Sequence, residues 1–423
     1  MYNSIAIEDF GTPVAVLANR GFINDAHSAA SSKGIPGVRV IPENVACEAT
    51  VAADIEKGIG EVMDDIVAAL TVPLTPEEKS PKPKQAKAPS RIIYKGDFQD
   101  FNRYFYTHGW GDGLPLTPPT EEAVAEMMTG TDLPPDHIVT KVIPRMGKAT
   151  VEKIAINAVM AGALPTHMPV IIAALEAVMT PKARYDTFQV STGSWSPFLI
   201  LNGPVRNDIQ VNTSSGALSP GNIANAAIGR ALALISRNIG GARPGIEDMG
   251  VIGNPGKYSL VLGEFEEASS WEPLHVDRGY NKEDSTLTVF FPNSYSQTIP
   301  AQTSAQGIAD RWAELVTGGI SCLVVIPDHA YILSSEGWTK GKLKKYIVEK
   351  AHEKNENSNL TEDDFIIVVA GGPGVWLGIF RSAGGSAMGN FHNDFVTTRI
   401  NFPRNWDKLV AKYKDVVPDY IRY

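Results

Sequence analysis

The stretch GVRVIPENVACEATVAADIEKGIGEVMDDIVAAL, residues 37–70, contains an apolar run and a helical pattern separated by one short loop. Residues 37–41 are typical of a buried strand. Apolar side chains then recur at helical spacing as far as Leu70, and Thr50 can cap the first turn of this helix. Cys47 lies in the loop between the two elements. The sequence therefore predicts a cysteine at the carboxyl end of a strand and close to a helix N-terminus.

A second strand and helix precede this stretch. Residues 13–18 form an apolar strand pattern, and a short helix is expected to end near Ala30. The order strand, helix, strand, helix predicts a small βαβα domain with parallel strands over residues 1–74. A domain of this size has little core of its own, so we expect it to pack on the rest of the chain or on another subunit.

Composition changes sharply after this domain. Residues 75–90 are rich in Pro and Lys and lack large apolar side chains, which predicts an extended linker. Residues 91–423 then form a larger domain of the α/β or α+β class, without a detectable internal sequence repeat. Its expected strands are 198–201, 258–263, 286–291, 321–326 and 365–370, and its expected helices are 98–106, 150–162, 170–179 and 222–238.

The overall composition narrows the functional class. The 423 residues are 43% hydrophobic and 20% charged, which is typical of a globular protein. A net charge of −9 argues against a nucleic-acid partner. The N-terminus lacks a signal-peptide pattern and no apolar stretch approaches the ~20 residues of a membrane span. With only two cysteines, the chain is expected to be a cytoplasmic protein that binds a small molecule and forms a homo-oligomer.

Cys47 is the first candidate catalytic residue. A thiolate near the positive end of a helix dipole is stabilised, which lowers the pKa of the thiol and makes it a better nucleophile. Glu48 lies beside it and is a candidate partner. The alternative is that Cys47 is a small buried apolar residue without chemistry. Cys322, inside an apolar strand, is expected to be such a core residue.

The segment of residues 214–225 is the second candidate site. It is rich in glycine and serine and runs into the helix of residues 222–238. Asn222 and Asn225 lie in the first turn and Arg230 lies two turns on, so all three are assigned to binding an anionic substrate. The alternative is that the asparagines only cap and pack, and that Arg230 pairs with an acid such as Asp248.

Two further loops combine acids with a histidine. Glu272 and His275 can form an acid–base pair or supply two metal ligands, although a salt-bridge network explains them equally well. His108 and Asp112 lie in a glycine-rich loop around Trp110 and are candidates for proton transfer or substrate contact. The glycine turn of residues 370–374, after a buried strand, is a place for an anionic group or a tight structural turn.

Several of these stretches resemble one protein family. Strand 13–18, residues 32–40, and the stretches 109–115, 149–162, 221–245 and 271–279 resemble the UGSC family of selenocysteine or cysteine proteins, and more distantly the selenoprotein B component of glycine reductase. The resemblance implies redox-active Sec or Cys in the loop after the first strand. This chain has Asn19-Arg20-Gly21-Phe22 there, so that chemistry does not carry over. Asn19 and Arg20 are assigned to substrate binding, in a cleft shared with the loop of Cys47.

These patterns predict an enzyme that acts on a small polar, anionic organic substrate by carbon–heteroatom bond cleavage or transfer, with Cys47 as nucleophile. The sequence does not distinguish a lyase, a hydrolase and an oxidoreductase. One alternative is a metalloenzyme that uses Glu272 and His275, with or without Cys47, so a metal cofactor and no cofactor both stay open. The other is a non-catalytic ligand-binding or redox-partner protein.

A thiol-reactivity measurement tests the prediction for Cys47. Because a lowered pKa raises the thiolate fraction, iodoacetamide should alkylate Cys47 faster than it alkylates a free model thiol at neutral pH. Cys47→Ser should abolish turnover while leaving the far-UV circular dichroism and the melting temperature unchanged. Alkylation no faster than that of the model thiol would show that Cys47 is not activated.

Overall fold

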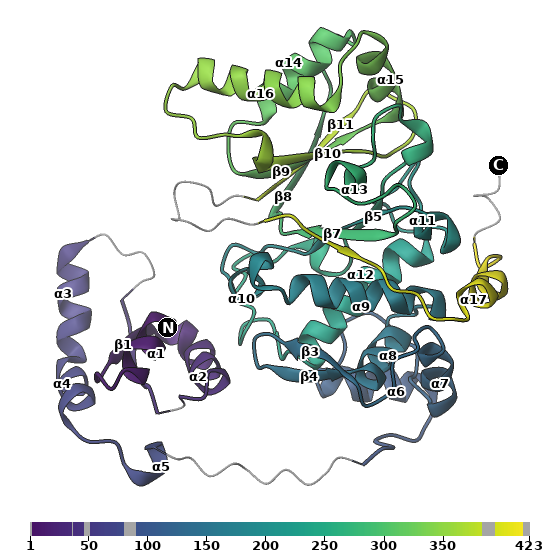
Figure 1. The fold of residues 1–423 in the computed structure, drawn as a ribbon. Coiled ribbons are helices and arrows are strands. Elements are labelled where there is room, and N and C mark those ends of the chain that lie inside the picture. Colours follow the sequence, from purple (N-terminus) through teal and green to yellow (C-terminus); the bar gives the residue numbers. More distant parts are fainter. Residues whose placement is uncertain (1, 36, 46–50, 80–89, 383–393, 418–423) are drawn as a thin grey trace.

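The computed structural model describes residues 2–35, 37–45, 51–79, 90–382 and 394–417. Helices and strands alternate along most of this length, so the chain is a mixed α/β protein, as the sequence predicts (Figure 1). Among these residues, no helix is both long enough and apolar enough to cross a membrane.

The N-terminal unit is built around two parallel strands, β1 Ala15–Asn19 and β2 Arg39–Glu43. Its helices are α1 Tyr2–Asp9, α2 Ile23–Ser32, α3 Ala52–Glu61, α4 Met63–Thr71 and α5 Pro76–Lys79. Helix α2 makes the crossover that two parallel strands require, so the predicted βαβα order with parallel strands is confirmed. The buried side chains of this unit are few and centre on Ile5, Ala30 and Val38.

The helix expected over residues 50–70 is interrupted. Helices α3 and α4 meet at Val62, whose φ of −114° and ψ of 12° are not helical. Gly58 and Gly60 lie in the last turn before this break, and glycine is the least favourable residue in a helix after proline. Thr50, the expected cap, lies outside the described residues, and Val51 precedes α3 without a side-chain cap.

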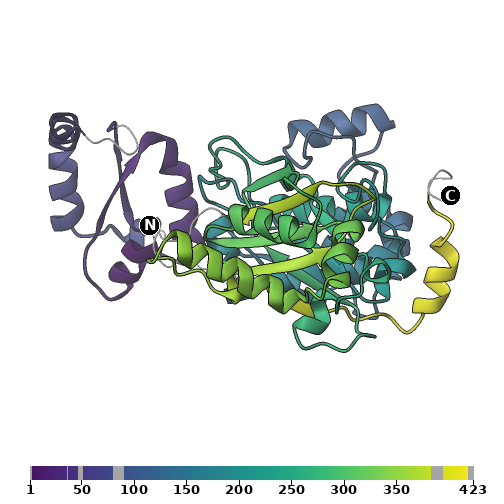
Figure 2. The same ribbon diagram turned by 90° about the horizontal axis from the view of Figure 1, so that it is seen from above.

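The larger part is a stack of four layers, with helices outside and two sheets inside (Figures 1 and 2). The first sheet has the strand order β12 Val396–Arg399, β7 Thr286–Phe290, β5 Phe198–Asn202, β6 Val261–Gly263. The second sheet has the order β8 Ser294–Thr298, β11 Leu377–Ser382, β9 Ile320–Val325, β10 Phe365–Val369. The outer helices are α8 Val151–Met160, α9 Met168–Val178 and α12 Ile223–Asn238 on the first sheet, and α14 Ala305–Leu315, α15 Pro327–Ser335 and α16 Lys340–Lys354 on the second.

Smaller elements complete the larger part. They are α6 Phe98–Thr107, α7 Glu121–Met128, the hairpin β3 Ile138–Val142 and β4 Gly147–Thr150, α10 Tyr185–Phe188, α11 Val205–Asp208, α13 Leu274–Asp277 and α17 Trp406–Tyr413.

The layers explain why the central strands are apolar throughout. Successive side chains of a strand point to opposite faces, and both faces of these sheets are covered. In β9, Cys322 and Val324 pack between the two sheets, whereas Leu323 and Val325 pack against the outer helices. Cys322 is fully buried, which confirms that it is a core residue.

The two sheets have the same plan although the sequence shows no repeat. In each sheet, one parallel pair is followed by two antiparallel neighbours: β6 with β5, then β7 and β12; β10 with β9, then β11 and β8. Each half of the chain also gives its last strand to the other sheet, since β8 follows β7 and β12 follows β11. The sheets are therefore interlocked by the path of the chain.

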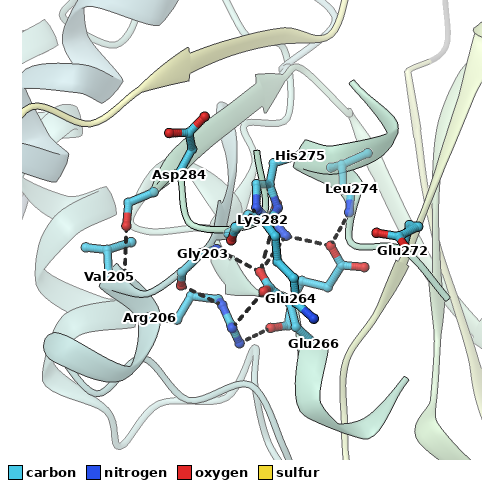
Figure 3. A network of polar contacts seen from close by, with 12 residues as sticks. Gly203, Val205, Arg206, Glu264, Glu266, Glu272, Leu274, His275, Lys282 and Asp284 are labelled. Carbon is cyan, nitrogen blue, oxygen red and sulfur yellow. Dashed lines mark hydrogen bonds and ion pairs between the residues drawn. The ribbon is translucent and has the colours of Figure 1, made fainter. Parts of the chain in front are cut away.

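A buried carboxylate connects the parallel strand pairs at their carboxyl ends. Glu264 directly follows β6 and is 1% exposed. Its carboxylate accepts hydrogen bonds from the Asn202 side chain (2.6 Å), from the backbone N–H of Leu274 (2.7 Å) and from that of Val369 (3.3 Å), the last residue of β10 (Figure 3). The ammonium of Lys340 lies 3.6 Å away. Glu264 thus ties the first sheet, the second sheet and α13 together.

Removal of this carboxylate should destabilise the fold strongly. Glu264→Ala leaves the Asn202 amide, two backbone N–H groups and Lys340 without their acceptor, so we expect a loss of about 3–5 kcal/mol in the free energy of unfolding. Urea denaturation measures this loss. Glu272→Ala, at an exposed position nearby, is the matched control and should change the value by less than about 0.5 kcal/mol. Equal effects of the two substitutions would contradict the role of Glu264.

Candidate functional site

The glycine-rich loop of residues 107–115 is held against helix α12. Arg230 makes a two-pronged ion pair with Asp112, with Nε–Oδ2 of 2.7 Å and Nη2–Oδ1 of 2.9 Å, and also donates to the Pro115 carbonyl. One turn pair further along the same helix, Arg237 Nε donates to the Gly109 carbonyl and Asn238 donates to that of Trp110, both at 3.0 Å. Side chains seven or eight positions apart share one helix face, so α12 fixes the whole loop.

His108 and Trp110 lie on the other side of this loop. The Trp110 ring packs edge-on against Phe105, with ring centroids 5.3 Å apart. The exposed His108 stacks on Tyr104 at 4.1 Å, and its Nδ1–H donates to the Tyr104 carbonyl. The structure therefore brings Asp112 to α12 and leaves His108 in an aromatic cluster.

A cavity of 260 Å³ lies where this loop meets α12, and we call it the α12 cavity. Apolar side chains form much of it, among them Leu199, Leu232 and Leu260. Its polar side chains are Asp112, Tyr185, Gln189, Ser236, Arg237, Asp248, Asn254, Lys257 and Tyr258. Four glycines, at positions 229, 250, 253 and 256, bring the backbone close to the space. The residues come from β5, from α12 and from the loop before β6.

The charges around the α12 cavity do not cancel. Asp112 is paired with Arg230, and Asp248 receives both of its close contacts from Lys257 Nζ, at 2.6 and 2.7 Å. Arg237 uses only Nε, toward Gly109, and its other guanidinium nitrogens make no hydrogen bond within the described part of the chain. The cavity therefore keeps one uncompensated positive charge, which favours an anionic ligand.

A neutral hydroxyl pair lies at the back of the cavity. The Tyr185 hydroxyl is 2.7 Å from Ser236 Oγ, which in turn donates to the Leu232 carbonyl. Burial raises the pKa of Tyr185 well above its usual value, so this hydroxyl stays protonated at all ordinary pH values. It can donate a hydrogen bond or deliver a proton, but it does not act as a base.

Asn222 and Asn225 make contacts within the protein. Asn222 caps α12, because its Oδ1 accepts from the N–H groups of Ala224 and Asn225, and its Nδ2 donates to the Gln210 carbonyl. Asn225 accepts from the N–H of Asn212 and donates to the carbonyls of Asn212, Ala217 and Val261. Neither side chain is among those that line the α12 cavity.

Glu272 and His275 lie at the buried cluster around Glu264, away from α12 (Figure 3). His275 is fully buried; its Nε2 donates to the Lys282 carbonyl at 3.2 Å, and its Nδ1 lies 3.9 Å from Glu266 Oε1. The side chain of Glu272 is exposed. Arg206, 2% exposed, completes the cluster through ion pairs with Glu266 and Glu267. Within the described residues, no three His, Cys, Asp or Glu side chains are grouped so that they could hold a metal ion.

The candidates of the N-terminal unit lie at the carboxyl ends of β1 and β2. Asn19 Nδ2 donates to the Val45 carbonyl at 2.7 Å, and Arg20 Nε donates to Asn44. The loops that follow the two parallel strands therefore lie side by side. Cys47 and Glu48 lie outside the described residues.

Sequence reasoning missed the side chains that define the α12 cavity. Arg237 and Lys257 were not singled out, and neither was Tyr185. The spacing of Arg230 and Arg237 by two helical turns was the signal for a shared basic face. The glycines at 250, 253 and 256 around Lys257 were the signal for a loop that approaches a ligand.

Comparison with known proteins identifies no relative. A scan against protein-family models finds no match, and neither does a search of curated proteins or of solved structures. The function is therefore argued from the geometry of the chain itself.

A double-mutant cycle tests the attachment of the loop. The side chains of Arg230 and Asp112 are only 16% and 12% exposed, so Arg230→Ala and Asp112→Ala should show a coupling energy of about 1–3 kcal/mol in urea denaturation. The matched control is the pair Arg103 and Asp100, which is 75% and 58% exposed and should couple by less than about 0.5 kcal/mol. Additive effects of the Arg230 and Asp112 substitutions would show that the ion pair does not hold the loop.

Proposed function

We propose that this protein is an enzyme that acts on a small polar organic anion, and that the α12 cavity is its substrate site. The observation that carries the proposal is Arg237, a cation on the cavity wall whose charge no described side chain neutralises. A guanidinium presents several N–H donors in one plane, which matches the two oxygens of a carboxylate.

The size and lining of the cavity support a small substrate. At 260 Å³ the cavity is just below the range of about 300–1,000 Å³ that is usual for drug-sized ligands. Leu199, Leu232 and Leu260 would contact a short carbon skeleton. Gln189 and Asn254 add amide groups that can bind its polar substituents. These features fit an organic acid of a few carbon atoms.

The cavity also has groups that can handle protons during bond cleavage. The Tyr185 hydroxyl can deliver a proton to a leaving oxygen or nitrogen, with Ser236 beside it. Lys257 and Asp248 form a second pair that can exchange a proton once a substrate separates them. These groups support the proposed carbon–heteroatom chemistry without choosing between cleavage and transfer.

Thiol chemistry in this proposal depends on Cys47. Cys322 is fully buried between the sheets, and burial raises the pKa of its thiol well above the usual value, so it cannot serve as the nucleophile. The resemblance to the UGSC family and the position of Cys47 after β2 support a role for Cys47. The metal alternative has no grouping of described ligands in its favour, whereas a binding protein without catalysis would use the same α12 cavity.

Substitution of Arg237 tests the substrate site. Lactate should raise the melting temperature of the wild-type chain, whereas neutral lactamide should not. Arg237→Met should weaken lactate binding, measured by isothermal titration calorimetry, by roughly 10- to 150-fold, because a charge-assisted hydrogen bond contributes about 1.5–3 kcal/mol. Arg237→Lys should lose less, since the charge remains.

Arg404→Met is the matched control, because the Arg404 side chain is 94% exposed and belongs to a different surface. It should leave lactate binding unchanged. The proposal fails if Arg237→Met binds lactate as well as the wild-type chain does, or if the wild-type chain does not distinguish lactate from lactamide.

A further inference from the structure

A second cavity, of 220 Å³, lies at the carboxyl ends of the parallel strands β9 and β10. There the turn of residues 370–374 meets the loop of residues 213–219, and Gly371 N–H donates to the Thr213 carbonyl at 2.9 Å. The carboxyl ends of neighbouring parallel strands are the usual place for a ligand in α/β folds. At the corresponding end of β5 and β6, the cluster around Glu264 fills the space with protein side chains. The substrate site proposed above uses neither of these two loops.

The lining of this second cavity favours a neutral ligand. Of the described residues that form it, none carries a charged side chain. The N–H groups of the glycine turn are also in use, since Gly371 donates to Thr213 and Gly374 donates to Asp328 Oδ2 at 2.8 Å. An anion would therefore find neither a cation nor those two free donors here.

The shape of the cavity favours a flat ligand. The Tyr295 ring is stacked on Phe380, with centroids 4.4 Å apart and planes 17° apart, and it is still 46% exposed. Trp376, 55% exposed, is a second aromatic wall. Between them Gly378 has no side chain, and a Cβ atom added there would lie 3.7 Å from the Tyr295 ring. The missing side chain leaves space beside a fixed aromatic surface, while Gln297 and the turn carbonyls offer polar edges.

We propose that this second cavity binds a neutral planar heteroaromatic ring of the size of a nucleobase. Aromatic side chains bind such rings by stacking, and an amide with backbone carbonyls can pair with the polar ring edge. A volume of 220 Å³ suits one ring system and little more. This site and the α12 cavity have no lining residue in common, so the two proposals stand or fall separately.

Adenosine is the probe for this site, with binding measured by titration calorimetry and by the fluorescence of Trp376 in the wild-type chain. Trp376→Ala should weaken adenosine binding roughly tenfold, because stacking on one aromatic side chain has about this effect. Gly378→Ala should weaken it as well by filling the space. Its new methyl group would have Val324 Cβ at 3.4 Å as nearest neighbour, an ordinary contact, so this variant should fold normally.

Tyr331→Ala is the control, since Tyr331 is 74% exposed on α15 and does not line the cavity. It should leave adenosine binding unchanged. AMP carries the same ring with a charged phosphate and should bind no more tightly than adenosine. The proposal is overturned if millimolar adenosine does not bind the wild-type chain, if Trp376→Ala and Gly378→Ala bind it unchanged while folded, or if AMP binds much more tightly.

Discussion

The buried carboxylate of Glu264 is the contact on which the larger part of the molecule depends. It accepts hydrogen bonds from three separate segments, at Asn202, Leu274 and Val369, and thereby fixes where β6 ends relative to β10. A buried carboxylate is costly unless its hydrogen bonds are made, so this arrangement tolerates little displacement. Both cavities border the same strand, since Leu260 just before β6 lines the α12 cavity and Leu262 within β6 lines the second one. Glu264 therefore positions the walls of both.

The two acidic clusters of the chain have different characters. Around Glu264 and Arg206, the charges are enclosed by protein and satisfied by one another and by backbone groups. Around α12, the pairs Asp112–Arg230 and Asp248–Lys257 are partly exposed and border an open space with Arg237 in excess. Charges of the first kind hold elements in place, whereas charges of the second kind can respond to a ligand. The position of His275 in the first cluster links it to the structural role.

The sequence predicted the buried framework well and the edges poorly. Strands such as β10, with five consecutive buried side chains, are recognisable because burial on both faces requires an uninterrupted apolar run. The edge strands β8 and β12 read SYSQT and VTTR and are largely exposed, so nothing in their composition separates them from loops. The shared plan of the two sheets was invisible for a related reason, because it lies in strand pairing and not in side-chain identity. At the site, Asp112 and Arg230 were each singled out, but their pairing across 118 positions required the fold. Glu264 stands in the acidic run GEFEE, which resembles a solvated turn until Val369 is brought beside it.

The central claim is that the α12 cavity holds an organic anion at Arg237. The most direct measurement is a crystal structure of the wild-type chain soaked with lactate. The account predicts lactate in the α12 cavity, with its carboxylate within hydrogen-bond distance of the Arg237 guanidinium and with the Asp112–Arg230 pair intact. An α12 cavity without lactate, in crystals where lactate binds at other cations of the chain, would contradict it.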